Sequence, residues 1–170
     1  MHKWKAFMMA ALIALLTTSC LKNSDNNFNQ ALQNRLDDQA LQTYLAFHGI
    51  LANRDTILLL GGDTTYLYYV IDSVGSGDTV RLQDTITVHF WGRFLNDSTF
   101  AKADTTTLTT VLQNTIPAWQ IGVQKITAGG GIEIYAPSVL CYGYYGLPPI
   151  IPSNTPLIYS IQLLDVKHAH

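Results

Sequence analysis

Apolar residues recur every three to five positions between residues 32 and 48. This spacing places them on one face of a helix, and Gly49 follows as a helix stop. The polar pair Asp37 and Asp38 is predicted to lie on the solvated face, and His48 is predicted to be a packed or helix-terminal residue rather than a ligand. The apolar face consists of Leu32, Leu36, Leu41, Tyr44, Leu45 and, at its end, His48.

The pattern changes after residue 55, where two short runs flank a turn signal. Residues 56–60 are largely apolar, residues 61–64 are Gly-Gly-Asp-Thr, and residues 66–71 are aromatic and β-branched. Such runs on either side of glycines predict a β-hairpin. The loop at 73–78 is predicted to separate a helix-and-strand part, residues 30–77, from a main domain, residues 78–170.

The main domain favours strands. Ile86, Val88 and Phe90 alternate with polar residues, which predicts a strand with one buried face. Similar patterns predict strands at 132–135 and 157–163.

One helix is predicted between the strands, at residues 117–126. Pro117 suits a first helical position, where its missing N–H group is not needed. Trp119, Val123 and Ile126 then share one face. Strands interrupted by one short helix indicate an α+β fold, with the helix packed across an antiparallel sheet.

The first twenty residues have the pattern of an export signal. Lys3 and Lys5 precede an apolar run at 6–16, which is shorter than the roughly 20 residues that span a bilayer. The small residues before Cys20 resemble a bacterial lipoprotein cleavage box, although Thr17 stands where that box usually has a larger aliphatic residue. The alternative is an ordinary signal peptide in which Cys20 is incidental.

The lipoprotein interpretation predicts where the protein lies. Residues 1–19 would be a signal peptide and residues 20–29, polar and rich in asparagine, a flexible tether. We expect an exported protein that a lipid on Cys20 anchors to the cell-envelope membrane, at the outer membrane on its periplasmic or surface side. No second long apolar segment follows, so the predicted contact is an anchor and not a span.

Charge and cysteine content exclude several classes of protein. The chain has 10 basic and 12 acidic residues and a net charge of −2, and without a basic cluster we expect no nucleic-acid partner. If Cys20 is lipidated, Cys141 has no partner for a disulfide and is expected to be a packed thiol. His168 and His170 are too few to form a metal site, and we expect no metal and no cofactor.

Six short motifs in the second half occur in the order of a known family. They are Val-His-Phe-Trp-Gly at 88–92, Ser-Thr-Phe at 98–100, Ile-Pro-Ala-Trp at 116–119 with Gly122, Tyr-Ala-Pro at 135–137, Tyr-Gly at 142–143 and Ile-Ile-Pro at 150–152. On these residues, the chain from about 84 to 167 resembles an FK506-binding-protein-type (FKBP-type) peptidyl-prolyl isomerase domain. The preceding helix and tyrosine-rich strand are similar to the N-terminal extension of exported, lipid-anchored members.

The resemblance implies a curved antiparallel sheet wrapped round one short helix, with a pocket between them. It implies four catalytic residues: Trp119 as the pocket floor, Ile116 and Tyr142, whose backbone N–H and hydroxyl donate to substrate carbonyls, and Phe100 as a wall. The residues implied to complete the substrate-binding site are Phe90, Leu108 and Tyr159 as walls, Thr115 at the edge, and Ile150 and Ile151 on an overhanging loop.

The implied activity is cis–trans isomerisation of X–Pro bonds in unfolded or extended proline-containing polypeptides, assisting the folding of exported envelope proteins. Such a site needs aromatic walls and a few fixed donors, and no titrating residue. A macrolide is the second class of ligand that the resemblance implies.

Four positions depart from the family pattern. Phe90 replaces a tyrosine, Ala101 an aspartate, Leu108 an aromatic residue, and Leu147 stands where histidine is frequent. The first two changes together remove a phenol and a carboxylate from one side of the pocket. Two alternatives therefore stay open: a catalytically weak or inactive peptide-binding chaperone lipoprotein, and an envelope assembly subunit that uses the fold as a scaffold.

Overall fold

The computed structural model describes residues 29–169, and this part of the chain begins with the predicted helix. Helix α1 spans Gln30–Phe47. The Asn29 side chain accepts a hydrogen bond from the Leu32 amide at 3.0 Å and so caps the first turn. The helix ends at Phe47, and its C-cap His48 is followed by Gly49 in the left-handed conformation with φ +65°. The helix, its stop and the helix-terminal place of His48 are confirmed, whereas the predicted signal peptide, Cys20 and the tether up to residue 28 lie outside the described residues.

The buried face of α1 differs from the predicted one. Leu41, Tyr44 and Leu45 are buried as expected, but Leu32 and Leu36 are about half exposed. Their place is taken by Asn34 and Asp37, which are buried and hydrogen-bonded. The prediction that Asp37 lies on a solvated face is wrong, because the surface beneath the first half of α1 offers polar partners.

The predicted hairpin is confirmed and belongs to a larger sheet. Strands β1 (Asn53–Leu58) and β2 (Thr64–Ser73) pair antiparallel. The other strands are β3 (Thr85–Phe94), β4 (Thr99–Val111), β5 (Gly131–Ala136) and β6 (Leu157–Lys167). Strand order is β1-β2-β5-β6-β3-β4 with antiparallel pairs throughout, so the hairpin continues the sheet that the later strands form.

Shorter elements connect the strands. Helix α2 spans Pro117–Val123 with proline in its first turn, and so ends three residues earlier than predicted. Short 3-10 turns are η1 (Leu112–Asn114), η2 (Ser138–Leu140) and η3 (Gly143–Tyr145). Strand β4 was not predicted as a whole: it is a threonine-rich edge strand that is mostly exposed, so it has little apolar alternation.

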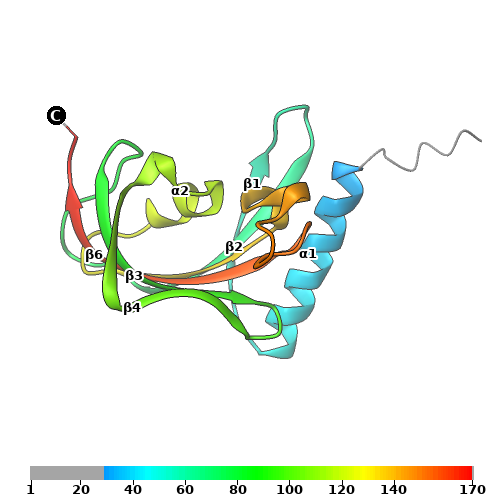
Figure 1. Ribbon diagram of the computed structural model, residues 1–170, viewed down its shortest axis with the longest axis horizontal. Helices are drawn as coiled ribbons and strands as arrows, with labels where there is room; N and C mark the ends of the chain where they lie inside the picture. The colour runs from blue at the N-terminus through cyan, green and yellow to red at the C-terminus, as the bar shows by residue number, and fades with distance from the viewer. Residues whose placement is uncertain (1–28, 170) are drawn as a thin grey trace, which may run out of the picture.

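The two helices cover opposite faces of the sheet. Figure 1 shows the sheet curving around α2, with α1 at the right of the picture. Along β5 and β6, Ile134 and Tyr159 belong to the core under α2, whereas Tyr135 and Ile158 pack with residues of α1. This arrangement confirms the predicted α+β fold, in which a curved antiparallel sheet wraps round a short helix.

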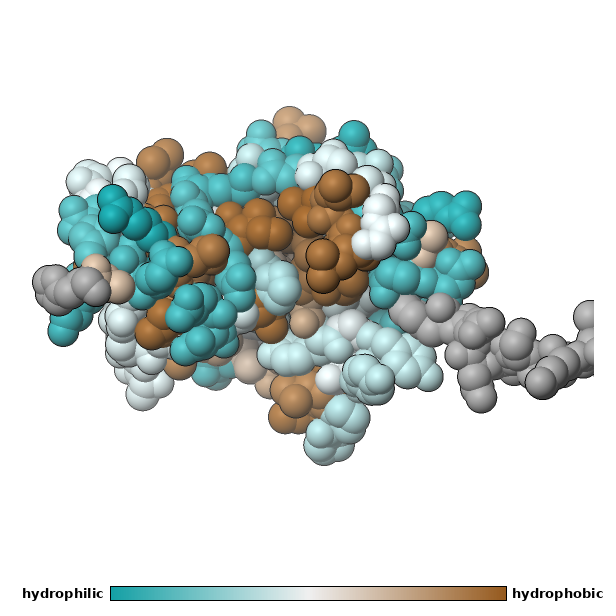
Figure 2. Space-filling model, turned by 90° about the horizontal axis from the view of Figure 1, so that it is seen from above, coloured by the Kyte–Doolittle hydropathy of each residue, from teal (hydrophilic) through white to brown (hydrophobic). Residues whose placement is uncertain are grey.

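The surface is largely polar, with apolar patches. On the face seen in Figure 2, apolar side chains are gathered between polar ones. Exposed large apolar residues in the loop after Tyr142 include Tyr145 and Ile150. Between residues 29 and 169, none of the helices combines the length and hydrophobicity needed to cross a bilayer.

Candidate functional site

A cavity of about 380 Å³ lies between α2 and the inner face of the sheet. It is built by β3 and β4 on one side, by α2 and the turn that leads into it, and by β6 with the loop that carries Tyr142. No Asp, Glu, His or Lys is among its lining residues. The lining residues are Phe90, Phe100, Ala101, Leu108, Thr110, Asn114, Thr115, Ile116, Trp119, Tyr142 and Tyr159.

Four aromatic rings form a connected frame around Trp119. The Phe90 and Tyr159 rings meet the indole nearly edge-on, with centroid distances of 5.1 and 5.6 Å. The Phe100 ring meets Tyr159 at 5.8 Å and 89°. Edge-to-face pairs of this kind are favourable beyond their buried area, so the frame is held in one geometry.

Two glycines allow these rings their positions. A Cβ atom on Gly92 of β3 would lie 2.5 Å from Cζ of Phe100. A Cβ atom on Gly122 of α2 would lie 2.3 Å from Cδ1 of Ile134 on β5. Gly92 therefore makes room for one wall of the cavity, and Gly122 lets α2 approach the sheet closely enough for Trp119 to reach its place.

The rim next to α2 presents a backbone donor. The Ile116 N–H makes no hydrogen bond to any other residue in the described part of the chain. Its turn is fixed, because Gln120 Nε2 donates to the Thr115 carbonyl at 2.7 Å and Thr115 Oγ1 donates to the Leu112 carbonyl at 2.7 Å. An acceptor that enters the cavity meets a rigidly held N–H group.

The opposite rim carries Tyr142 on a loop that α1 holds. Ser138, at the start of η2, donates from its backbone N and from Oγ to Asp37 Oδ2 at 2.7 and 2.6 Å. Cys141 lies between this anchor and Tyr142, and desolvation of its sulfur, helped by the nearby Asp37, raises the pKa of its thiol. A thiol held protonated in this way fits the packed, unreactive residue that the sequence predicts.

The structure brings together all the residues predicted to form the pocket except Ile150 and Ile151. Ile151 is 1% exposed and belongs to the core, whereas Ile150 is 54% exposed and is not part of it. The short antiparallel bridge between Leu147 and Ile151 turns the loop so that these neighbours face different surroundings. Neither residue lines the cavity.

The cavity is open and includes two residues that the motifs did not mark. Leu108 forms a wall, while Leu147 and the apolar run 57–60 do not reach the cavity. Thr110 and Asn114 complete the lining. They lie on the unpredicted strand β4 and on η1, and a polar side chain in an exposed segment carries no pattern that would single it out.

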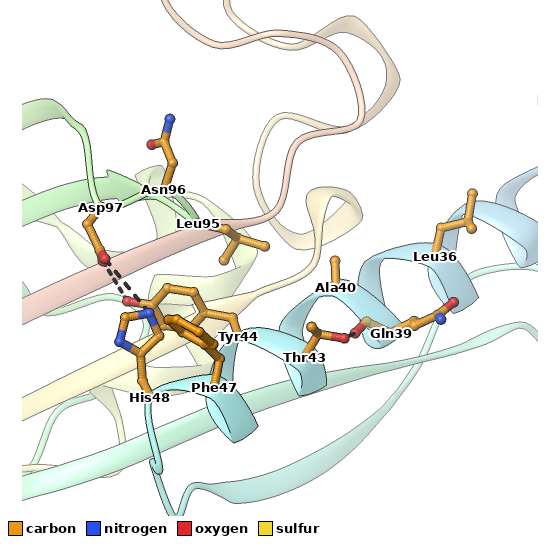
Figure 3. Close-up of a pocket in the computed structure, with 10 residues that line it drawn as sticks. All are labelled: Leu36, Gln39, Ala40, Thr43, Tyr44, Phe47, His48, Leu95, Asn96 and Asp97. Carbon is orange, nitrogen blue, oxygen red and sulfur yellow. Dashed lines mark hydrogen bonds and ion pairs between the residues drawn. The ribbon is translucent and has the colours of Figure 1, made fainter.

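A second, larger groove of about 740 Å³ lies between α1 and the turn that joins β3 to β4, and it shares no lining residue with the aromatic cavity. Figure 3 shows Tyr44 of α1 and His48, which follows the helix as its C-cap, next to Asp97 in the turn between β3 and β4. Tyr44 donates to Asp97 at 2.6 Å, and burial together with this carboxylate raises the pKa of Tyr44 to about 12. The contact fixes the end of α1 to the sheet.

Among residues 29–169, no group of three His, Cys, Asp or Glu side chains could hold a metal ion.

Comparison with known proteins connects the cavity to one family. The sequence model for "FKBP-type peptidyl-prolyl cis-trans isomerase" matches residues 77–164. FkpA of Escherichia coli K12 is 34% identical over 108 residues, which are 62% of this chain and 40% of that protein. The isomerase Mip of Coxiella burnetii is 33% identical over 105 residues, 59% of this chain and 45% of that protein.

Solved structures agree with this result. The crystal structure of FkpA from Escherichia coli has a TM-score of 0.64 at 27% identity, covering 82% of this chain and 62% of that one. A crystal structure of a peptidyl-prolyl cis-trans isomerase from Pseudomonas syringae pv. tomato also has a TM-score of 0.64, at 20% identity, covering 84% and 98% of the two chains, and so supports the fold. The chain spans about two fifths of the length of the curated relatives it matches.

Proposed function

The chain belongs to the FKBP-type peptidyl-prolyl cis-trans isomerase family, and from this membership we propose that its aromatic cavity catalyses the cis–trans isomerisation of X–Pro bonds. The observation that supports the activity is the cavity itself: an open pocket walled by aromatic rings, with Trp119 at its centre and a rigid Ile116 N–H at its rim. Residues 78–170 supply its lining, and residues 30–77 hold the Tyr142 loop and extend the sheet.

The mechanism needs no covalent step. Resonance keeps the peptide bond planar, with a rotation barrier of about 18–20 kcal/mol. The planar amide is more polar than the twisted one, so a dry cavity lined by Trp119, Phe90 and Phe100 favours the twisted transition state relative to the planar ground state. The Ile116 N–H and the Tyr142 hydroxyl hold carbonyl oxygens on either side, so that the rotation occurs about a fixed substrate.

The remaining substrate-binding roles follow from position. Leu108 and Tyr159 complete the walls, and Thr115 holds the edge beside Ile116. Ile151 supports the loop from within the core. Ile150 is exposed on the loop and is available to contact the flanks of an extended polypeptide rather than the proline ring.

A protease-coupled assay with a proline-containing tetrapeptide tests the activity. The wild-type protein should accelerate isomerisation, and Trp119→Ala should abolish the acceleration because the cavity loses its floor. Trp91→Ala is the matched control, since Trp91 neighbours Phe90 on β3 but does not line the cavity, and it should stay active. Peptide binding without acceleration in the wild type would instead identify a non-catalytic binding module, and absence of both would contradict the proposal.

We further propose that the protein is exported and lipid-anchored, and that it acts on unfolded envelope proteins. The support is the leader pattern, in which Lys3 and Lys5 precede an apolar run at 6–16 and small residues lead from this run to Cys20. Growth with an alkyne-tagged fatty acid should label the wild type but not Cys20→Ala, which should also leave the membrane fraction. A macrolide that occupies the aromatic cavity should compete with the peptide.

A further inference from the structure

Two buried hydrogen-bond donors in the cavity lining have no partner. Within residues 29–169, neither Trp119 Nε1 nor the Tyr159 hydroxyl makes a hydrogen bond, and both atoms are shielded from solvent. Buried polar atoms are nearly always satisfied in native proteins, and an unsatisfied one costs stability. Two such donors in one lining indicate that something entering the cavity brings acceptors.

The fold holds Tyr159 firmly in this position. Tyr159 lies on β6 between two partners, opposite Gly92 of β3 and Ile134 of β5. Its ring stands edge-on to both Trp119 and Phe100, and the residue is 3% exposed. The hydroxyl therefore cannot turn away to find water.

The surroundings of the Tyr159 hydroxyl keep it a donor. Burial raises the pKa of Tyr159 above its ordinary value, and the neighbouring Cys141 and Tyr142 raise it further. The Tyr142 hydroxyl lies close to that of Tyr159, but the two do not meet in hydrogen-bonding geometry. No carboxylate lines the cavity, so the protein offers no charged acceptor there.

The chemistry of an X–Pro bond matches this arrangement. Proline has no backbone N–H, so the amide that must enter the cavity presents carbonyl acceptors and no donor of its own. The cavity offers the reverse, with donors at Ile116, Trp119 and Tyr159 and aromatic rings between them. The peptide therefore supplies the acceptors that the cavity lining lacks, and the lining supplies the donors that the X–Pro amide lacks.

We propose that the Tyr159 hydroxyl is a substrate-binding group that donates a hydrogen bond to a backbone carbonyl oxygen of the bound prolyl peptide. The inference rests on the proposed isomerase function and adds to it a donor on strand β6. This donor supplies a phenol hydroxyl to a cavity in which Phe90 replaces the tyrosine of the family pattern. Tyr159 is thereby a determinant of peptide affinity and orientation in addition to being a wall.

The variant Tyr159→Phe tests the proposal because it removes one oxygen atom and keeps the ring. The expected result is a roughly tenfold lower kcat/KM, about 1.4 kcal/mol, with a similar loss in calorimetric affinity for a proline-containing tetrapeptide. The unliganded variant should melt at the same or a higher temperature, since an unsatisfied buried hydroxyl has been removed. A role in stability alone would leave kcat/KM and affinity unchanged, and that result would overturn the proposal.

Tyr135→Phe is the matched control. Tyr135 is equally buried but lies on the α1 side of the sheet, where its hydroxyl donates to Glu133 at 2.5 Å. This variant should melt at a lower temperature with kcat/KM unchanged. An inactive, non-binding wild type would refute the proposed function itself, whereas an active wild type with an equally active Tyr159→Phe variant would refute only the role of the hydroxyl.

A change on the peptide side identifies the acceptor. Replacing each backbone carbonyl in turn by a thiocarbonyl weakens it as an acceptor, and peptide affinity is then measured for the wild type and for Tyr159→Phe. At one position the loss seen with the wild type should disappear in the variant, which is the signature of a direct contact in a double-mutant cycle. Losses that are equal in both proteins at every position would contradict the contact.

Discussion

Asp37 on α1 and Ser138 on the loop that leads to Tyr142 are joined by two hydrogen bonds. The backbone N and the Oγ of Ser138 donate to Asp37 Oδ2 at 2.7 and 2.6 Å, and both residues are buried. Gln33 donates to the other carboxylate oxygen at 2.7 Å. The N-terminal helix therefore holds, from the far side of the sheet, one rim of the cavity under α2.

Removing this carboxylate should weaken both the fold and the site. In Asp37→Ala, the buried N–H and hydroxyl of Ser138 lose their acceptor, which should lower the free energy of unfolding by about 1–3 kcal/mol. The loosened loop should also lower kcat/KM, because Tyr142 is no longer fixed. Urea unfolding and the isomerase assay measure the two effects. Arg35→Ala, on the exposed side of the same helix, should change neither, and a fully stable Asp37→Ala would show that the contact is not needed.

The titration of the Asp37 carboxyl should make the free energy of unfolding depend on pH. Burial raises the pKa of Asp37 above 3.8, outweighing the opposite effect of the hydrogen bonds from Ser138 and Gln33. A carboxyl whose pKa is raised by folding binds its proton more tightly in the folded protein. The stability that this proton contributes is therefore fully present below about pH 4 and is lost as the pH rises through the pKa of the folded state.

The measurement is urea unfolding between pH 3 and 7 for the wild type and for Asp37→Asn, whose amide does not titrate. The difference in unfolding free energy, wild type minus variant, should fall as the pH rises above 3.8 and then become constant. A difference that grows with pH would mean that the hydrogen bonds outweigh burial and that the pKa of Asp37 is lowered.

Elements whose buried residues recur with a regular period could be predicted from the sequence. Ile86 and Val88 alternate with polar neighbours, and the motif around Trp119 predicted the helix that completes the cavity. The local pattern places the charged Asp37 on the solvated face. Its partner Ser138 is far away in the chain, and no local pattern can reveal such a partner. Strand β4 was missed since an exposed edge strand needs no apolar alternation.

Ile150 and Ile151 show a second limit of the sequence. The motif identified their loop, but the bridge between Leu147 and Ile151 decides which side chain enters the core. The unpartnered hydroxyl of Tyr159 likewise becomes visible only when the surrounding atoms are in place. Local patterns therefore indicated which segments build the site, while long-range packing decides the direction and the partner of each side chain.

Gly92→Ala should damage one wall of the cavity. The new methyl group would lie 2.5 Å from Cζ of Phe100, so the Phe100 ring must move, and overpacking of this kind costs about 1–3 kcal/mol of stability. We expect kcat/KM to fall by more than the unfolded fraction explains, because Phe100 and its contact with Tyr159 shape the cavity. Gly131→Ala on β5 is the control, since its methyl would meet atoms no closer than 3.6 Å. Equal activity of both variants would contradict a role for Phe100 as a wall.

Ala101→Asp should restore a polar group to the apolar side of the cavity and raise the isomerisation rate. Ala101 lines the cavity next to Phe90 and Phe100, so a carboxylate there would face the substrate, and its field acts strongly in a site with few other polar groups. The single variant buries a charge without a partner, and we therefore expect only a few-fold gain in kcat/KM together with lower stability.

Combining it with Phe90→Tyr supplies a hydroxyl donor from the neighbouring strand. The gain in kcat/KM of the double variant should therefore exceed the product of the two single effects, and its stability should recover. Protease-coupled kinetics and urea unfolding of the two single variants and the double variant measure this coupling. Additive effects, or a folded Ala101→Asp protein without any gain, would show that the apolar side of the cavity does not limit its activity.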